Sequence, residues 1–238
     1  MAPDFDFSLS TLKTSFEKIL AQNYKVITCE QYVSFKQNKT EEKILVNRVD
    51  VDWSCKKAKI FAELYNQLGI KGTFFIRLHG DEYNPFSFEN YRCLKFIKDS
   101  GHEVGYHSEI IDQGHIWDES AKDCLVRDIK AINNMLDITI KGVASHGGLT
   151  GLNNLDFWKT NKPAEFGLLY EGYDKEPAFN LFFESLYVSD SNCRWKCYRN
   201  GVLQKDDQRT LREHCEANEP VVYSTLHPET YFHRHIYE

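Results

Sequence analysis

The sequence predicts an α/β fold, built as a single barrel of mostly parallel strands. Short apolar segments alternate with amphipathic helical patterns from residue 44 to residue 226, and this alternation is typical of parallel sheets. The length of 238 residues suits one α/β barrel. Hydrophobic residues make up 42% of the chain, which supplies a full core without covalent cross-links.

The first 43 residues predict a helix followed by a short strand. Ser10 or Thr11 is placed to cap the helix, and its apolar face is formed by Leu12, Phe16, Ile19 and Leu20. Residues 24–28 (YKVIT) alternate like a strand, and the polar residues 36–43 predict a loop. We expect residues 1–43 to pack as an extension on one domain that spans residues 1–238.

The barrel pattern begins at residue 44 with a strand, a helix and a second strand. Residues 44–51 (ILVNRVDV) form the predicted strand, and Ser54 is placed to cap a helix that runs to about Leu68. Gly69 ends that helix, as glycine commonly does, and residues 71–78 (KGTFFIRL) predict the next strand.

The remaining pattern repeats this alternation up to residue 226. Helices are predicted over residues 88–100, 118–136 and 207–218. Strands are predicted over residues 102–107, 142–145, 166–170, 186–189 and 221–226.

Acidic and imidazole side chains stand where these predicted strands end: Asp50, Asp52, His107, His146 and His227. The carboxyl ends of parallel strands meet at one edge of a sheet or barrel, where the chemistry of such folds gathers. We therefore expect these residues, which are distant along the chain, to form one site.

The acidic pair in Asp50-Val51-Asp52 lies on one face of its strand, because side chains alternate along a strand. Two carboxylates that close repel each other unless a cation or a proton lies between them. One can bind a metal while the other serves as a base. A polar strand end with two solvated aspartates is the alternative interpretation.

Two histidines are candidate metal ligands in this edge. His107 ends a strand in GHEVGYHSE, and His146 precedes two glycines that leave room for a pocket. Glu109 and Asp112 follow closely and are candidates for ligation, for hydrogen bonds to a ligand or, in the case of Glu109, for substrate binding. Each histidine taken alone also fits a structural role, and His102, at the opposite end of its strand, is expected to be structural.

Two further segments complete the candidate site. His227 follows the apolar strand VVYSTL and precedes a proline, and imidazole titrates in the range suited to a general acid. Asp190, Arg194 and Trp195 lie within six residues, where an acid, a guanidinium and an indole can orient other groups or line a sugar pocket. An ordinary loop with one buried tryptophan is the alternative.

Composition narrows the classes of partner and the compartment. The net charge of −6 and the absence of a Lys/Arg run disfavour nucleic acid and anionic membrane surfaces. No apolar run is long enough for a membrane span, and the first residues lack a secretory signal pattern. The seven cysteines are odd in number, without a CxxC pair, as in reduced cytosolic proteins, with a cysteine zinc site as the minor alternative. We expect a cytoplasmic protein.

Taken in order, five segments resemble the motifs of the polysaccharide deacetylase superfamily (NodB homology, carbohydrate esterase family 4), over about residues 44–227. RVDVDWS is similar to its acidic motif and GHEVGYHSE to the opening of its second motif. VASHGG, SDSNCRW and STLHPE fall at the places of the third, fourth and fifth motifs. The GYHSE, SHGG and TLHPE forms resemble most a subgroup associated with bacterial surface-polysaccharide and lipopolysaccharide loci.

This resemblance implies a distorted (β/α) barrel and a set of roles. Asp50 maps to the catalytic base, Asp52 and His107 map to metal ligands, and His227 maps to the general acid. Asp190 and Arg194 map to the residues that tune the base and the acid.

The chain departs from the family pattern at two positions. The family's second motif carries another metal-binding histidine four residues after the first, where this chain has Ile111. The third motif has His146-Gly147-Gly148 in place of an arginine and a proline. We infer that His146 replaces the missing ligand, with Glu109 or Asp112 as alternatives.

The sequence thus predicts a hydrolase that depends on a divalent metal ion, with Zn²⁺ as the expected ion. This hydrolase would remove an acyl group from an amino sugar or sugar intermediate of surface-polysaccharide synthesis. A sugar-binding pseudo-enzyme on the same fold is the second hypothesis, because Ile111 cannot bind metal. A phosphatase or glycosyltransferase that uses the acidic pair is the third, and it leaves the three strand-end histidines unexplained. The oligomeric state is left open.

Overall fold

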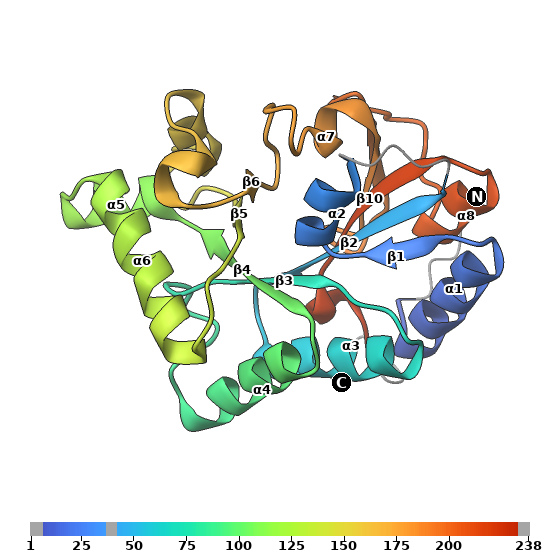
Figure 1. Ribbon diagram of the computed structural model, residues 1–238, viewed down its shortest axis with the longest axis horizontal. Coiled ribbons are helices and arrows are strands. Elements are labelled where there is room, and N and C mark those ends of the chain that lie inside the picture. Colours follow the sequence, from blue (N-terminus) through green and yellow to red (C-terminus); the bar gives the residue numbers. More distant parts are fainter. Residues whose placement is uncertain (1–6, 37–41, 233–238) are drawn as a thin grey trace.

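The computed structural model describes residues 7–36 and 42–232, which form one curled sheet covered by helices (Figure 1). Ten strands take part, in the order β6-β5-β4-β3-β2-β10-β7-β8-β9, with β1 pairing to β2 beside this path. Their bounds are β1 Lys25–Ile27, β2 Ile44–Val51, β3 Thr73–Ile76, β4 Glu103–Ser108, β5 Gly142–Ser145, β6 Tyr170–Glu171, β7 Leu186–Ser189, β8 Lys196–Arg199, β9 Val202–Leu203 and β10 Val221–Leu226.

The sheet is parallel from β6 through to β7, as the alternation of strands and helices predicts. Its last two strands run antiparallel: β8 pairs with β7, and β9 pairs with β8. Among the described residues β6 and β9 each have a single neighbour, so the arc stays open. The α/β class and the mostly parallel sheet are confirmed, and the described strands form a curled half-barrel, which is consistent with the distorted barrel that we expected although it does not close.

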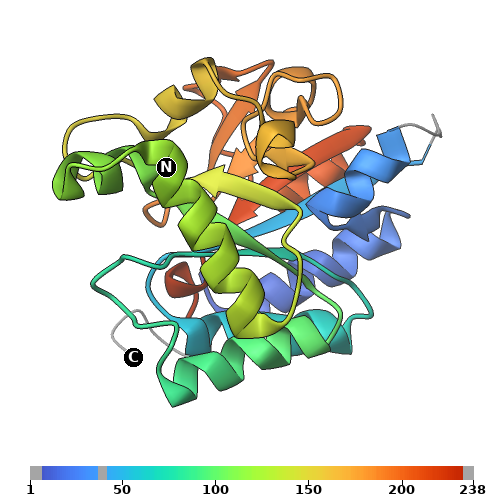
Figure 2. The same cartoon turned by 60° about the vertical axis from the view of Figure 1, so that its left-hand side comes forward.

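The described residues also form eight α-helices and three short 3-10 helices. Their bounds are α1 Leu9–Ala21, α2 Cys29–Lys36, α3 Cys55–Gln67, α4 Phe88–Asp99, α5 Ile110–Trp117, α6 Ala121–Leu136, α7 Leu181–Glu184, α8 Leu211–Glu216, η1 Asn154–Lys159, η2 Pro163–Phe166 and η3 Pro228–Thr230. Figure 2 shows α4 and α6 along the outside of the arc. No helix among the described residues is long and apolar enough to cross a membrane.

Side chains of the sheet separate into an outer and an inner layer, because they alternate along each strand. Outward residues such as Val49 and Val51 on β2 pack with the helices, for example with Phe61 of α3, in the larger apolar cluster. The inner layer forms a second cluster that contains Val46, Phe75, Ala144, Tyr170 and Tyr223. Alternation therefore directs the polar side chains of the inner face into the hollow of the arc.

Gly105 allows the ring of Phe75 to pack closely against the inner face of β4. A Cβ atom at Gly105 would lie 2.5 Å from Cε1 of Phe75 on the neighbouring strand, closer than real Cβ atoms approach. The glycine before His107 therefore lets an aromatic ring pack flat on β4. Its neighbour two residues along the strand, His107, points to the same inner face.

Several element boundaries match the sequence patterns, and others need correction. The predicted strands 44–51, 142–145, 186–189 and 221–226 coincide with β2, β5, β7 and β10. Ser54 caps α3 as predicted, by accepting from the backbone N–H of Lys57. The cap of α1 is Ser8, which accepts from the N–H of Thr11, so the prediction of Ser10 or Thr11 was wrong by two or three residues.

Three segments differ in kind from the prediction. The expected strand 166–170 is mostly turn and irregular chain, since Phe166 ends the 3-10 helix η2 and only Tyr170 continues into β6. Residues 110–117 form helix α5, which ends at Asp118 in the left-handed conformation before α6 begins. In the predicted loop 36–43, Lys36 ends helix α2, and residues 37–41 lie outside the described residues.

Candidate active site

The carboxyl edge of the parallel strands gathers the predicted acids and histidines. Asp50 is the penultimate residue of β2 and Asp52 follows that strand, His107 belongs to β4, and His146 follows β5. The register His107↔Ala144 and a hydrogen bond of 2.9 Å from the N–H of His146 to the carbonyl oxygen of Ser108 place the two histidines side by side. Ligand atoms of Asp52, His107 and His146 all lie within 4.8 Å of one another.

The tautomer of His107 is fixed by the neighbouring strand. Its Nδ1 lies 2.8 Å from the carbonyl oxygen of Ala144, which can only accept, so Nδ1 carries the proton. Nε2 then keeps its lone pair when the ring is neutral, and it lies 3.2 Å from Oδ1 of Asp52 and 3.4 Å from Oδ2 of Asp50. A histidine whose other nitrogen donates to a carbonyl is the usual arrangement of a metal ligand.

His146 lies against a buried carboxylate. Its Nδ1 lies 3.1 Å from Oε1 of Glu109, although the two groups do not have hydrogen-bond alignment. Its Nε2 faces Asp52, 4.0 Å from Oδ1. Arg77 holds Glu109 in place through an ion pair of 2.8 Å, so Glu109 supports His146 from behind.

These three side chains fit a divalent cation. Oδ1 of Asp52 is buried and makes no hydrogen bond among the described residues, although His107 and His146 both face it. Burial would raise the pKa of Asp52, but His107, His227 and His146 hold it well below the usual range. Two imidazoles and one carboxylate, with room for a further ligand, form a donor set typical of catalytic zinc sites.

Asp50 is neutralised by a partner that sequence reasoning missed. Arg48 donates from Nε to Oδ1 at 2.7 Å and from Nη2 to Oδ2 at 2.8 Å, with both side chains buried. Burial would raise the pKa of Asp50, whereas Arg48 and His107 lower it. Arg48 stands two residues before Asp50 on the same strand, and this spacing was the signal that could have identified it.

His227 and Asp190 form a buried pair next to this group. His227 Nδ1 lies 2.6 Å from Oδ1 of Asp190, and the backbone N–H of His227 donates to both carboxylate oxygens at 3.1 Å. The other ring nitrogen, Nε2, lies 3.9 Å from Oδ2 of Asp52. Burial alone would lower the pKa of His227, but the Asp190 carboxylate, aided by Asp50 and Asp52, raises it to about 10.

A pocket opens beside His227 and Asp52. It is lined by Asp52, Trp53, Ser191, Asn192, Cys193, His227, Glu229 and Thr230. The Trp53 side chain is 60% exposed at this pocket, so its ring is free to contact a ligand. Burial, together with the nearby Asp52, raises the pKa of Glu229 to about 8, and its Oε2 finds no hydrogen-bond partner within the described part of the chain. The sequence analysis did not select Trp53 or Glu229. Trp53 directly follows Asp52, and Glu229 lies two positions after His227, so their places in the sequence could have identified them.

Other predicted residues lie apart from the group. The Arg194 side chain is exposed, and no hydrogen bond or ion pair joins it to another candidate among the described residues. The half-buried Trp195 ring stacks on Phe7 with ring centroids 5.8 Å apart, and Trp195 does not line the pocket beside His227. Asp112 is occupied by Thr150 and Asn154 side chains and by backbone N–H groups, so it fixes the loop after His146. Glu109 lies behind His146 and does not line the pocket.

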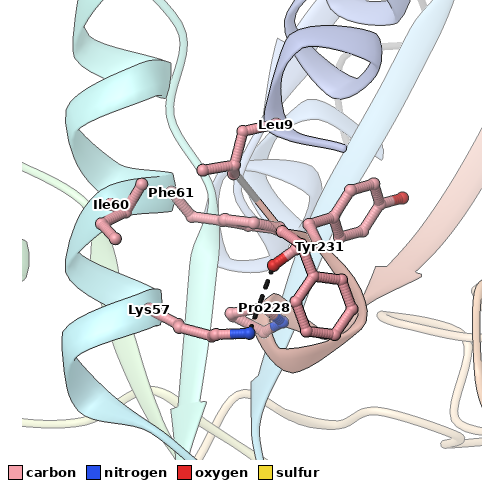
Figure 3. Close-up of a pocket in the computed structure, with 7 residues that line it drawn as sticks. Leu9, Lys57, Ile60, Phe61, Pro228 and Tyr231 are labelled. Carbon is pink, nitrogen blue, oxygen red and sulfur yellow. Dashed lines mark hydrogen bonds between the residues drawn. The ribbon is translucent and has the colours of Figure 1, made fainter. Parts of the chain in front are cut away.

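The segment after His227 is anchored by a separate apolar pocket, in which side chains of α1 and α3 meet Pro228 and Tyr231 (Figure 3). Lys57 of α3 donates to the carbonyl oxygen of Tyr231 at 3.3 Å, along the dashed line of the figure. The Tyr231 ring also contacts Phe61 edge to face at 5.4 Å. This packing fixes the chain on both sides of Glu229.

Comparisons with known proteins give a partial structural match. No protein-family profile matches the chain, and no curated protein is similar to it. One solved structure that resembles part of it is the chitin deacetylase of the fungal pathogen Colletotrichum lindemuthianum, with 17% sequence identity and a TM-score of 0.33. The similarity covers 42% of this chain and 45% of that one, so the chain spans less than half of that structure.

Proposed function

We propose that this protein is a metal-dependent hydrolase that removes an acyl group from the nitrogen of an amino sugar. The observation that carries the proposal is the meeting of Asp52, His107 and His146 beside a buried histidine–aspartate pair, at the carboxyl edge of one sheet. A Lewis-acid site next to a proton donor is the arrangement that amide hydrolysis requires.

The cation would be held by a carboxylate oxygen of Asp52 and by Nε2 of His107 and of His146. When bound, a zinc-like ion supplies polarisation of the acyl oxygen and a lower pKa for a water molecule. The Ala144 carbonyl fixes the His107 ring from behind by a hydrogen bond, and the Glu109 carboxylate lies 3.1 Å from Nδ1 of His146 on the side away from Asp52.

Asp50 is the base in this proposal. Arg48 occupies one side of its carboxylate, and each oxygen keeps a second lone pair. Oδ2 lies 3.4 Å from His107 Nε2, so it faces the place where the three ligands meet. Asp50 accepts a proton from the attacking water, while the water oxygen bonds to the acyl carbon.

His227 is the acid. Asp190 fixes its ring and stabilises its protonated form, which leaves Nε2–H facing the pocket and Asp52. As the carbon–nitrogen bond breaks, His227 gives this proton to the leaving nitrogen. The products are a carboxylic acid and a free amine, and exchange with solvent returns Asp50 and His227 to their starting states.

The proposed substrate class follows from the pocket and from the motif resemblance. The exposed Trp53 ring offers an apolar face on which a sugar ring can stack, and Ser191 and Asn192 offer polar groups. In this proposal Trp53 takes the sugar-binding place that we expected for Trp195. The resemblance of the GYHSE, SHGG and TLHPE segments to surface-polysaccharide enzymes points to an amino sugar of such polymers or of lipopolysaccharide.

One observation favours a second candidate function, a sugar-binding pseudo-enzyme. The guanidinium of Arg48 binds both oxygens of Asp50 and makes that carboxylate a weaker base. A chain in which Asp50 never accepts a proton would still bind a cation and a sugar. Turnover separates the two functions.

The test combines metal analysis with an assay of acyl release. We expect the purified chain, loaded with Zn²⁺, Co²⁺ or Mn²⁺, to release acetate from N-acetylglucosamine oligomers or from an N-acetylated surface-polysaccharide sugar. Asp52→Ala is expected to lower the rate by about 10²-fold or more, because a ligand and its transition-state stabilisation are lost. Asp99→Ala, at an exposed aspartate of α4, is the matched control.

Two results together would contradict the proposal. They are a purified wild type that binds no metal, and an Asp52→Ala variant that releases acyl groups as fast as the wild type. Saturable binding of the sugars without release under any metal would select the pseudo-enzyme instead.

A further inference from the structure

A second group of metal-ligand side chains lies outside the candidate active site. Cys197 belongs to β8, Asp207 to the loop between β9 and α8, and His214 to α8. The sulfur, a carboxylate oxygen and a ring nitrogen of these residues all lie within 4.8 Å of one another. None of the three is a candidate catalytic residue or lines the pocket beside His227.

The buried ring of His214 gives a second reason, besides proximity, to expect a ligand at this group. Its side chain is 0% exposed, and neither ring nitrogen has a hydrogen-bond partner among the described residues. A neutral imidazole carries one donor and one acceptor, and burying both unpaired is costly. Nε2 lies 3.7 Å from Oδ1 of Asp207, so the unpaired ring faces the other two side chains. A cation between them would satisfy the acceptor nitrogen of this ring.

The backbone around the group is already fixed. The N–H of Gln204 donates to the carbonyl oxygen of Cys197 at 2.9 Å, and the N–H of Asp207 donates to that of Gln204 at 3.1 Å. Thr210 and Glu213 cap each other's backbone at the start of α8. The loop therefore returns to β8 without help from a bound ion.

Arg209 orients the carboxylate of Asp207. Its Nε donates to Oδ1 at 3.0 Å and its Nη2 to Oδ2 at 2.6 Å. Ligating carboxylates commonly accept such outer hydrogen bonds. The Asp207 side chain is 22% exposed and lines a surface hollow formed by residues 203–209, which gives an ion a path to the buried sulfur.

We propose that Cys197, Asp207 and His214 form a second cation site, suited to Zn²⁺, that ties β8 and its following loop to α8. A thiolate, an imidazole and a carboxylate are ligands that zinc accepts, and the thiolate disfavours Mg²⁺ and Ca²⁺. On binding, the Cys197 thiol loses its proton to solvent as the sulfur–metal bond forms. The site stands independently of the proposed hydrolase function, because it shares no ligand with the active site.

The test is a Co²⁺ titration of the full metal-free chain, followed by optical absorption. Cobalt bound to a thiolate gives a sulfur-to-metal charge-transfer band in the near ultraviolet, whereas oxygen and imidazole ligands do not. We expect this band in the wild type and in Asp52→Ala, and its displacement by Zn²⁺. We expect its loss in Cys197→Ser and at least a tenfold weaker affinity in His214→Gln. The matched control is Cys215→Ser, at a buried cysteine next to His214 in helix α8, and this variant should keep the band.

A wild type without the band, or a band that survives Cys197→Ser, would overturn the proposal. The His214→Gln variant keeps the test decisive if Cys197→Ser does not fold, because its cysteine is intact and only the affinity should change. Loss of the band in Asp52→Ala, with retention in His214→Gln, would likewise place the thiolate–metal contact elsewhere. Failure of acyl release with the band present would reject the hydrolase alone.

Discussion

The two ends of strand β4 carry the same residue type in opposite surroundings. His102 precedes the strand and packs against the rings of Phe74 and Tyr65, with centroids 5.2 Å and 6.1 Å away. Its Nδ1 accepts from the N–H of Gly72 at 3.3 Å, and burial, with Lys71 nearby, lowers its pKa to about 4. His107 lies near the other end and faces Asp50 and Asp52.

The environment of His107 reverses the effect of burial. Burial alone would lower its pKa, but the carboxylates of Asp50 and Asp52 raise it. The comparison teaches that burial does not decide the role of a histidine in this fold. The end of the strand does, because the carboxyl edge brings the acids of β2 and of the turn after it to the ring.

The sharpest test of this comparison replaces the two histidines in turn. We expect His107→Gln to lower the rate of acyl release by about 10³-fold, since a ligand of the cation is lost. His102→Gln should leave that rate within a factor of about two, because His102 lies at the far end of β4. Steady-state kinetics with the metal-loaded protein measures both. Equal losses in the two variants would remove the distinction between the strand ends.

Arg48 tests how the inner face balances the charge gathered at the carboxyl edge. Arg48→Met leaves the buried Asp50 carboxylate without its partner, and we expect the free energy of unfolding to fall by about 3–4 kcal/mol. The double variant Arg48→Met/Asp50→Asn should recover part of this loss, because no buried charge is left unpaired. Urea unfolding of the metal-free proteins gives the values. A single variant as stable as the wild type would show that Asp50 does not depend on Arg48.

The third prediction concerns proton transfer at the end of β10. His227→Gln should lower the rate of acyl release by about 10²-fold while metal content stays unchanged, because His227 donates a proton and binds no ion in the proposal. Asp190→Asn should lower the rate less and shift its pH profile, since it acts through His227. Metal analysis alongside the kinetics checks the difference. Loss of metal in His227→Gln would make His227 a ligand.

The smallest expected effect is the pH dependence that His102 gives to stability. Its pKa of about 4 in the folded chain lies below the value of about 6.5 in an unfolded chain, so the unfolded chain binds more protons between these values. Stability is therefore complete above pH 6.5 and falls as the pH drops toward 4. We expect the wild type to lose about 2 kcal/mol more than His102→Gln between pH 7 and pH 4.5. Parallel losses in urea unfolding would contradict this.

Much of this arrangement follows from strand periodicity. Residues 44–51 alternate so that Asp50 and Asp52 share a face, and the parallel pattern places His107, His146 and His227 at one edge. The same alternation of side chains places Arg48 on the face of Asp50. An arginine inside a strand nevertheless suggests an edge position more readily than a buried inner face. Its place among aromatic rings depends on the curling of the sheet, which no local pattern encodes.

The rest depends on contacts between distant segments. Trp195 is nearer than Trp53 to Asp190 in sequence, yet its ring packs on Phe7, which precedes helix α1. Arg194 shares a turn with Asp190, but this turn directs the side chain to solvent. The group at Cys197 combines strand β8, which pairs antiparallel with β7, with a loop and helix α8, so the alternation of parallel strands gave no indication of it.

The most direct test of the central claim is anomalous X-ray diffraction from crystals grown with Zn²⁺. We predict a zinc peak at the carboxyl edge, about 2.0–2.2 Å from a carboxylate oxygen of Asp52 and from Nε2 of both His107 and His146. An edge without zinc at saturating concentration, or a zinc ion there bound by neither histidine, would contradict it.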